Sequence, residues 1–97
     1  MDYRLIWSPQ ALDDIEAIAE YIARDSRTYA ESTVERIYQI PEKLRQFPKL
    51  GRIVPEKNQE SIRELFIFQY RIIYEIQKYA IHILAVVHGK RIIEDLI

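Results

Sequence analysis

The sequence predicts an α+β fold in which one strand and a helix hairpin precede a meander of three antiparallel strands (β-α-α-β-β-β). Apolar residues at helical spacing fill the first half of the chain, and three strand-like runs separated by two-residue turns fill the second. The chain has 97 residues, of which 48% are hydrophobic. That size suits one core, so we expect residues 1–97 to form a single domain.

The first half begins with a short strand at residues 2–7. The alternation places Tyr3, Leu5 and Trp7 on one side of the strand and Arg4 and Ile6 on the other. Ser8 and Pro9 mark a helix start, because a serine oxygen caps free amides and proline suits the first helical position. Apolar residues spaced three and four apart predict that this helix runs to about Arg24.

A second helix follows a tight turn at residues 25–28. Pro41 interrupts it, because proline has no amide to donate to the Ile37 carbonyl, and we expect a kink or a short break there. Two helices joined by so short a turn form an antiparallel hairpin that must pack on another layer. The residues expected on the buried side of the second helix are Ala30, Val34, Ile37, Leu44 and Phe47.

The second half opens with a loop at residues 48–60, which contains two prolines and a glycine. Strands are predicted at residues 61–68, 71–76 and 80–87, where β-branched and aromatic residues are frequent. Residues 69–70 and 78–79 read as tight turns between them. These strands therefore form the antiparallel sheet on which the helix hairpin packs.

Both faces of this sheet are expected to carry apolar residues. In the last strand we expect two alternating sets on opposite faces, namely Ile81, Ile83, Ala85 and Val87, and His82, Leu84, Val86 and His88. The helix hairpin would cover one face, and a partner would cover part of the other. Residues 89–97 have helical spacing and predict a terminal helical turn or a segment that folds on binding.

The composition excludes several classes of function. The chain has no cysteine, which rules out disulfides, thiolate metal sites and cysteine nucleophiles. With two histidines, we expect no metal site and no cofactor. No apolar run approaches the ~20 residues of a membrane span and no signal pattern is present, so we expect a cytoplasmic protein without a membrane partner.

The charge balance argues against extensive nucleic-acid binding. The net charge is -1, whereas proteins that hold long nucleic-acid backbones usually carry clustered excess positive charge. The basic residues of the second half are therefore expected at a local surface, where they meet an anion, a phosphate or a partner protein.

Five short motifs occur in a fixed order. They are WSPxAxxDI at residues 7–15, FPxxGRxVPE at 47–56, REL at 63–65, YRIIY at 70–74 and VVHGKR at 86–91. Together they resemble the RelE/ParE superfamily, the small toxins of type II toxin-antitoxin systems, often labelled plasmid stabilisation proteins. The resemblance implies a growth-inhibiting toxin that is neutralised by a cognate antitoxin protein.

The superfamily resemblance implies two alternative targets. ParE-like members act on DNA gyrase and lack nuclease residues, whereas RelE-like members are ribosome-dependent endoribonucleases that cut mRNA. The net charge of -1 favours the ParE-like branch, and so do the WSPxAxxDI and GRxVPE segments, which look more like those of ParE-like members. We therefore expect DNA gyrase as the target, with the ribosome and mRNA as the alternative. A third reading, a toxin fold that only binds an antitoxin, has no support in the sequence.

The nuclease alternative would need three catalytic groups. Attack of the 2′-hydroxyl on the adjacent phosphate requires a base, cations and an acid, without a metal. By resemblance to a related nuclease branch, Glu56 would be the base, Arg71 the phosphate clamp and His88 the acid. Each also has a structural reading: Glu56 as a loop charge, Arg71 as a sheet residue sharing a face with Ile73 and Glu75, and His88 as a surface or capping residue.

A wider basic set is expected to contact the target or a phosphate. Arg63 also has a structural reading, in which it pairs with Glu64 or Glu75, or with the antitoxin. The full set is Arg52, Lys57, Arg63, Arg71, Lys90 and Arg91.

Overall fold

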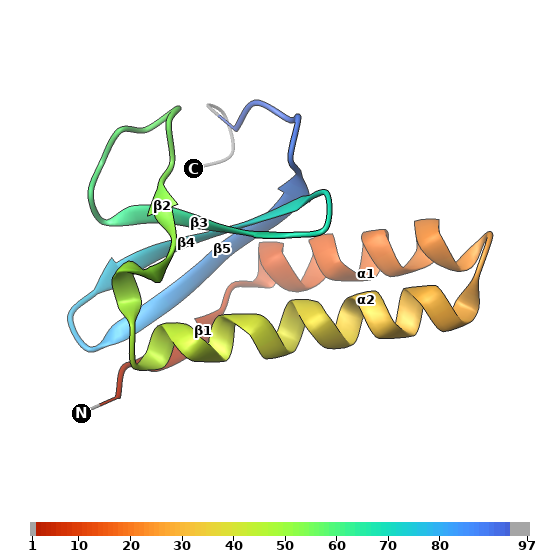
Figure 1. Cartoon of the computed structure of the whole chain (residues 1–97), viewed down its shortest axis with the longest axis horizontal. Helices are drawn as coiled ribbons and strands as arrows, with labels where there is room; N and C mark the ends of the chain where they lie inside the picture. The colour runs from red at the N-terminus through yellow and green to blue at the C-terminus, as the bar shows by residue number, and fades with distance from the viewer. Residues whose placement is uncertain (1, 94–97) are drawn as a thin grey trace.

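The protein folds into one five-stranded sheet with two helices packed on one face (Figure 1). The structure is a computed structural model that describes residues 2–93. The elements are β1 (Arg4–Trp7), α1 (Pro9–Ala23), α2 (Arg27–Gln39), the 3₁₀ helices η1 (Ile40–Arg45) and η2 (Pro48–Leu50), β2 (Arg52–Ile53), β3 (Ile62–Ile67), β4 (Tyr70–Gln77) and β5 (Ala80–His88).

The strand order is β1-β5-β4-β3-β2. Strand β1 runs parallel to β5, and the other neighbours are antiparallel. The predicted α+β class, N-terminal strand, helix hairpin and meander are confirmed. Strand β2 was missed, because two residues inside a loop give no periodic signal. No helix within residues 2–93 is long and apolar enough to cross a membrane.

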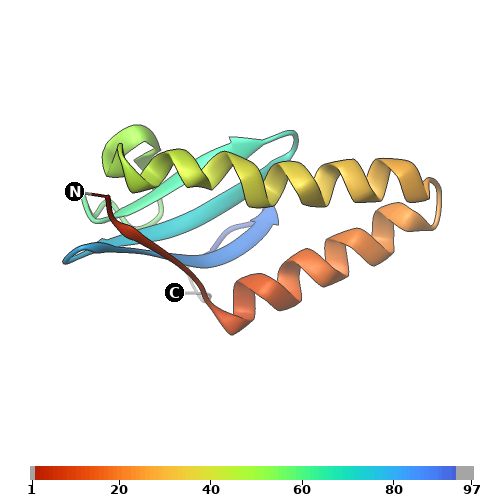
Figure 2. The same ribbon diagram turned by 90° about the horizontal axis from the view of Figure 1, so that it is seen from below.

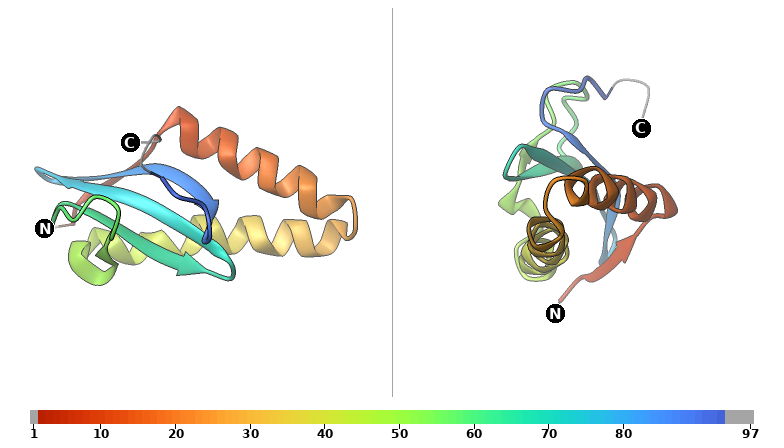
Figure 3. Two further views of the ribbon diagram at one scale, coloured as in Figure 1. Left: turned by 90° about the horizontal axis from the view of Figure 1, so that it is seen from above. Right: turned by 90° about the vertical axis from the view of Figure 1, so that its right-hand side faces the viewer.

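The helix hairpin extends past the end of the sheet (Figure 2 and Figure 3). Helix α1 is anchored by Ser8, whose Oγ accepts a hydrogen bond from the Ala11 amide at 3.0 Å and donates one to the Leu84 carbonyl at 2.9 Å. Ser26 caps α2 by accepting from the Tyr29 amide at 3.1 Å. Both caps satisfy amides that have no partner within the helix.

The predicted break near Pro41 is confirmed, because α2 ends at Gln39 and the chain continues as η1. Leu44 is fully buried, but the prediction that Phe47 is buried is wrong, since its side chain is 61% exposed. A 3₁₀ helix has three residues per turn instead of 3.6. After Gln39, residues at α-helical spacing therefore no longer fall on the buried side.

The prediction that Ile81, Ile83, Ala85 and Val87 share one face is also wrong. The β4–β5 register shifts between Ile73 and Tyr74, which is a β-bulge, and Leu84 has no opposite residue on β4. An extra residue reverses the alternation beyond it. Ile81 and Ile83 therefore lie in the core under the helices, whereas Ala85 and Val87 lie on the opposite face.

That opposite face, called here the open face, has a second apolar cluster covered by the chain itself. Val54, from the loop before β3, and Ile93, from the segment after β5, are fully buried there. Both segments lie on the side of the sheet away from the helices (Figure 1). The chain itself therefore covers this cluster, and a partner on the rest of the open face stays a prediction. Residues 89–93 form no helix, and the rest of the expected terminal turn lies outside the described residues.

Candidate functional site

Arg71 lies at the centre of the motif residues on the open face. Its Nε donates to Glu64 Oε1 at 2.6 Å, and its two terminal nitrogens donate to the two oxygens of Glu56 at 2.8 Å each. One of those nitrogens also donates to the Arg91 carbonyl at 3.0 Å. Arg71 is only 4% exposed, so its guanidinium is enclosed by acceptors from three other segments of the chain.

Glu64 is the second member of this ion-pair network and is 1% exposed. It accepts from Arg71 through one oxygen and from Arg52 Nε through the other, at 2.5 Å. A buried carboxylate is costly unless cations and donors surround it, and here two arginines do so. The network therefore runs Arg52–Glu64–Arg71–Glu56.

Sequence reasoning did not identify Glu64 as part of the site. The predicted turn at residues 69–70 would place Glu64 opposite Glu75. The actual turn is at Phe68 and Gln69, so Glu64 lies opposite Ile73, one diagonal step from Arg71. The acid–base pairing in REL and YRIIY would have been visible from the sequence with the turn placed one residue earlier.

Arg63 holds the loop before β2 rather than contacting the network. It donates to the carbonyls of Gly51 and Glu60, at 2.9 Å each, and lies 3.9 Å from the Glu60 carboxylate. The predicted pairing with Glu64 or Glu75 is wrong. Glu64 is consecutive with Arg63 and points to the opposite face, and Glu75 lies opposite Ile62, on the same face as Glu64. Arg63 therefore has partners that account for its place in the REL motif.

Tyr74 links the FPxxGRxVPE motif to the sheet. Its hydroxyl donates to the Pro48 carbonyl at 2.7 Å and accepts from the Gly51 amide at 2.9 Å. Tyr74 is fully buried beneath the segment that it holds. The motif residues Pro48, Gly51, Arg52 and Glu56 all make contacts to β3 or β4, so much of the motif is explained by the folding of this loop onto the sheet.

His88 lies apart from Glu56 and Arg71. It ends β5 opposite Tyr70, with the two ring centroids 6.2 Å apart, and its Nδ1 accepts from the Lys90 amide at 3.3 Å. Tyr70 belongs to the helix-side core, whereas Arg71 points to the open face. The structure therefore brings two of the three proposed nuclease residues together and places the third beside the helices.

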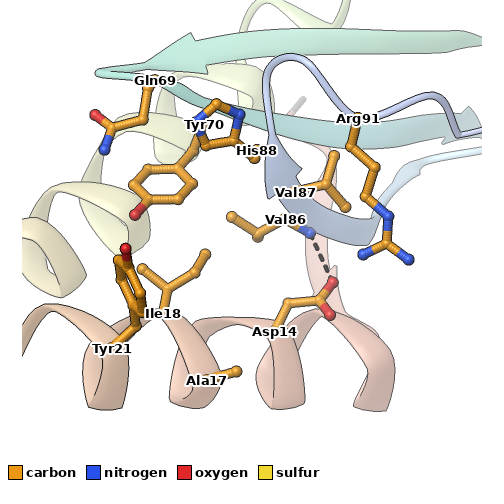
Figure 4. Close-up of a pocket in the computed structure, with 10 residues that line it drawn as sticks. All are labelled: Asp14, Ala17, Ile18, Tyr21, Gln69, Tyr70, Val86, Val87, His88 and Arg91. Carbon is orange, nitrogen blue, oxygen red and sulfur yellow. Dashed lines mark hydrogen bonds between the residues drawn. The ribbon is translucent and has the colours of Figure 1, made fainter.

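A groove of about 410 Å³ lies between α1 and the end of β5 (Figure 4). His88 and Arg91 line it, and Asp14 Oδ2 accepts from the Val86 amide at 2.9 Å. This carboxylate satisfies a backbone donor on the part of β5 that extends beyond β1. Of the other predicted cations, Arg52 and Lys90 are exposed and Lys57 is half-buried.

The Arg71 guanidinium holds the pKa of Glu56 well below its usual range, at about 2, mainly through the bidentate hydrogen bond and against the opposing effect of burial. Glu56 thus remains a carboxylate at any ordinary pH. Residues 2–93 contain no group of three histidine, aspartate or glutamate side chains placed to hold a metal ion.

The low pKa of Glu56 predicts an acid-sensitive contribution to stability. The contribution is present above the unfolded pKa of about 4.5 and is lost as pH falls toward the folded value of about 2. We expect the loss to be on the order of 2 kcal/mol in urea unfolding experiments between pH 5 and pH 2. Glu56→Gln should flatten this part of the profile, and an unchanged profile would contradict the ion pair.

Three features define the class: the strand order, the helix hairpin, and the packing of the FPxxGRxVPE segment on β3 and β4. This is the fold of the RelE/ParE toxins. The chain has a TM-score of 0.76 and 21% identity to a protein of the chromosomal ParDE toxin-antitoxin system from P. aeruginosa, covering 91% of this chain and 97% of that one. With the toxin-antitoxin complex RelBE2 from Mycobacterium tuberculosis, the TM-score is 0.59 and the identity 18%, over 91% and 99% of the two chains.

The sequence comparisons give the family. The chain is 28% identical to "Toxin RelE2" of Caulobacter vibrioides over an alignment of 90 residues. This alignment covers 92% of this chain and 98% of that protein. The family described as "ParE toxin of type II toxin-antitoxin system, parDE" matches residues 5–93. The protein therefore belongs to the ParE toxin family, and the resemblance inferred from the motifs is confirmed.

Proposed function

We propose that the chain acts as a one-domain toxin that inhibits DNA gyrase by protein contact, in the cytoplasm, and that a cognate antitoxin neutralises it. The toxin class follows from the family, and the toxin-antitoxin relatives support an antitoxin partner. The choice of gyrase over RNA cleavage rests on the hydrogen bonds of Arg71, the pKa of Glu56 and the position of His88.

The bonding of Arg71 is the observation that carries the proposal. Its donors are directed at Glu64, Glu56 and the Arg91 carbonyl, and the side chain is buried. A phosphate clamp must offer free donors to its ligand. To bind a phosphate, this guanidinium would first have to release Glu56 and leave Glu64 with one cation fewer.

Glu56 is poorly suited to act as a general base. Proton abstraction is most efficient when the pKa of the base lies near the working pH, and the pKa of Glu56 is about 2. His88 lies opposite Tyr70 on the helix side of the sheet, whereas Glu56 is bonded to Arg71 on the open face, so the acid and the base are on different faces. All three roles in the nuclease mechanism are therefore weakly supported.

The alternative function, a ribosome-dependent mRNA endoribonuclease, is favoured by one observation. Glu56 and Arg71 lie in direct contact, as a shared catalytic site would require.

We propose a different use for the basic set, in which Arg71 and Arg63 maintain the loop structure. The remaining members, Arg52, Lys57, Lys90 and Arg91, would contact the target protein.

Induction of the toxin alone should separate the two functions. We expect DNA damage without transcript cleavage, and purified protein at micromolar concentration should inhibit supercoiling by gyrase. His88→Ala should retain both effects, because its ring is exposed and has no catalytic task in this proposal. Ribosome-dependent mRNA cleavage that disappears in His88→Ala would instead establish the nuclease. Co-expression of the antitoxin should restore growth in either case.

A further inference from the structure

The turn between β3 and β4 lies over α2 (Figure 2). Exposed aromatic side chains meet here, because Phe68 of the turn is 53% exposed and Tyr29 of α2 is 46% exposed. Together with Arg36 of α2 they form what we call the turn patch. None of these residues belongs to the site described above.

The phenylalanine of the turn patch has an arginine over its ring, since Arg36 Cζ is 5.9 Å from the Phe68 centroid. Arg52 Cζ lies 5.0 Å from the Phe66 centroid in the same way, but on the open face, where Phe66 is opposite Arg71. Within residues 2–93, the side chain of Arg36 makes no hydrogen bond or ion pair. An arginine stacked in this way keeps its planar N–H edge available for a carboxylate.

Phe68 is held in an unfavourable backbone conformation, with φ of 54°. A bulky residue in the left-handed region costs on the order of 1–3 kcal/mol, and glycine or asparagine would avoid this cost. Because the ring is half exposed, core burial offsets little of that strain. The turn thus keeps an aromatic side chain at the surface against its local preference.

Strain alone does not single out the turn patch. Tyr79, in the turn between β4 and β5, has φ of 61°, is 58% exposed and lies beneath Lys78 at 5.7 Å. The patch differs in having a second aromatic ring, that of Tyr29, 6.3 Å from Phe68, and in carrying an arginine rather than a lysine over the strained aromatic residue. The β4–β5 turn therefore provides a matched control.

We propose that the turn patch docks an acidic segment of the target protein that also carries an apolar side chain. This inference rests on the proposed function, in that the toxin acts through contact with a protein. Arginine and aromatic residues dominate protein-binding hot spots, and unpaired Arg36 complements a carboxylate. A single-stranded nucleic acid fits less well, because base stacking needs the ring face of Phe68 that Arg36 occupies.

The test compares the double variant Arg36→Glu with Phe68→Ala against the control Lys78→Glu with Tyr79→Ala. Both change one cation and one exposed aromatic at a positive φ. The toxin concentration that half-inhibits supercoiling by purified gyrase should rise about tenfold or more in the patch variant. It should change less than about twofold in the control. Circular dichroism and thermal unfolding verify that both variants fold.

Inhibition by the folded patch variant equal to that of the unmodified protein would overturn the docking surface while leaving the proposed function intact. If the unmodified protein has no effect on gyrase, the proposed function fails by itself. Growth arrest on induction then becomes the readout, and its loss in the patch variant alone supports the docking surface, whereas its retention overturns it. Binding of a single-stranded DNA oligonucleotide that depends on Arg36 and Phe68 would overturn the assignment to an acidic protein segment.

Discussion

Replacing Arg71 with alanine should lower the free energy of unfolding by about 3–5 kcal/mol, because it removes the cation shared by two enclosed carboxylates. Glu64 has no exposed side-chain surface, and only 17% of the Glu56 side chain is exposed. Arg52 would remain beside Glu64, but Glu56 would lose both charge-assisted hydrogen bonds. The segment after β5 would also lose the bond to the Arg91 carbonyl.

Urea unfolding followed by circular dichroism measures this loss directly. Arg52→Ala is the matched control: it removes the other cation of Glu64, but its side chain is 60% exposed, so we expect about 1 kcal/mol or less. Combining Arg71→Met with Glu56→Gln should recover part of the loss by removing the carboxylate that has lost both hydrogen bonds to Arg71. A loss below about 1 kcal/mol for Arg71→Ala would mean that the network does not stabilise the fold.

This prediction changes how a loss of toxicity should be read. Arg71→Ala is an obvious variant for testing catalysis, and an inactive result would seem to support a nuclease. If the variant is partly unfolded, the same result follows for any toxin mechanism. His88→Ala is the more informative variant, because its exposed ring is removed without leaving a buried charge.

The local elements were predictable from sequence because their signals are local. Ser8 and Pro9 mark the start of α1, and Pro41 marks the break after α2. The faces of β5 were not predictable, because the bulge at Leu84 depends on pairing with β4. A single unpaired residue moved Ala85 and Val87 to the opposite face.

The site residues were recognised individually, but their partners were not. Arg71 and Glu56 were both singled out, yet only the folded loop shows that they neutralise each other. Glu64 was overlooked because its role depends on the β3–β4 register, which changes by two residues when the turn moves by one. Long-range register decides which charges meet, and the motifs alone do not specify it.

The second large loss of stability is expected when Gly51 is replaced. Glycine is required there because neighbouring atoms leave no space for a side chain, and not because of the backbone conformation. Its φ of -76° and ψ of 163° are accessible to any residue. An added Cβ would overlap the Glu64 carbonyl and lie 2.7 Å from Tyr74 Oη and 2.9 Å from Tyr74 Cε1. The first belongs to the backbone of β3, and Tyr74 is fully buried, so neither can move easily.

Gly51→Ala should therefore lower the free energy of unfolding by about 3–4 kcal/mol, from overpacking together with loss of the Gly51–Tyr74–Pro48 hydrogen bonds. Gly89→Ala is the matched control in the same urea experiment. Its Cβ would lie 3.1 Å from the Gln69 carbonyl and at least 3.7 Å from other atoms, so we expect about 1 kcal/mol or less.

Tyr74→Phe should cost about 1–3 kcal/mol on its own, because the Pro48 carbonyl and the Gly51 amide lose their shared partner. In combination with Gly51→Ala the two costs should be less than additive, since both act on the same hydrogen bonds. Full additivity would show that Gly51 is required only for its contact with the β3 backbone. Equal effects of Gly51→Ala and Gly89→Ala would contradict the close approach of the FPxxGRxVPE segment to the sheet.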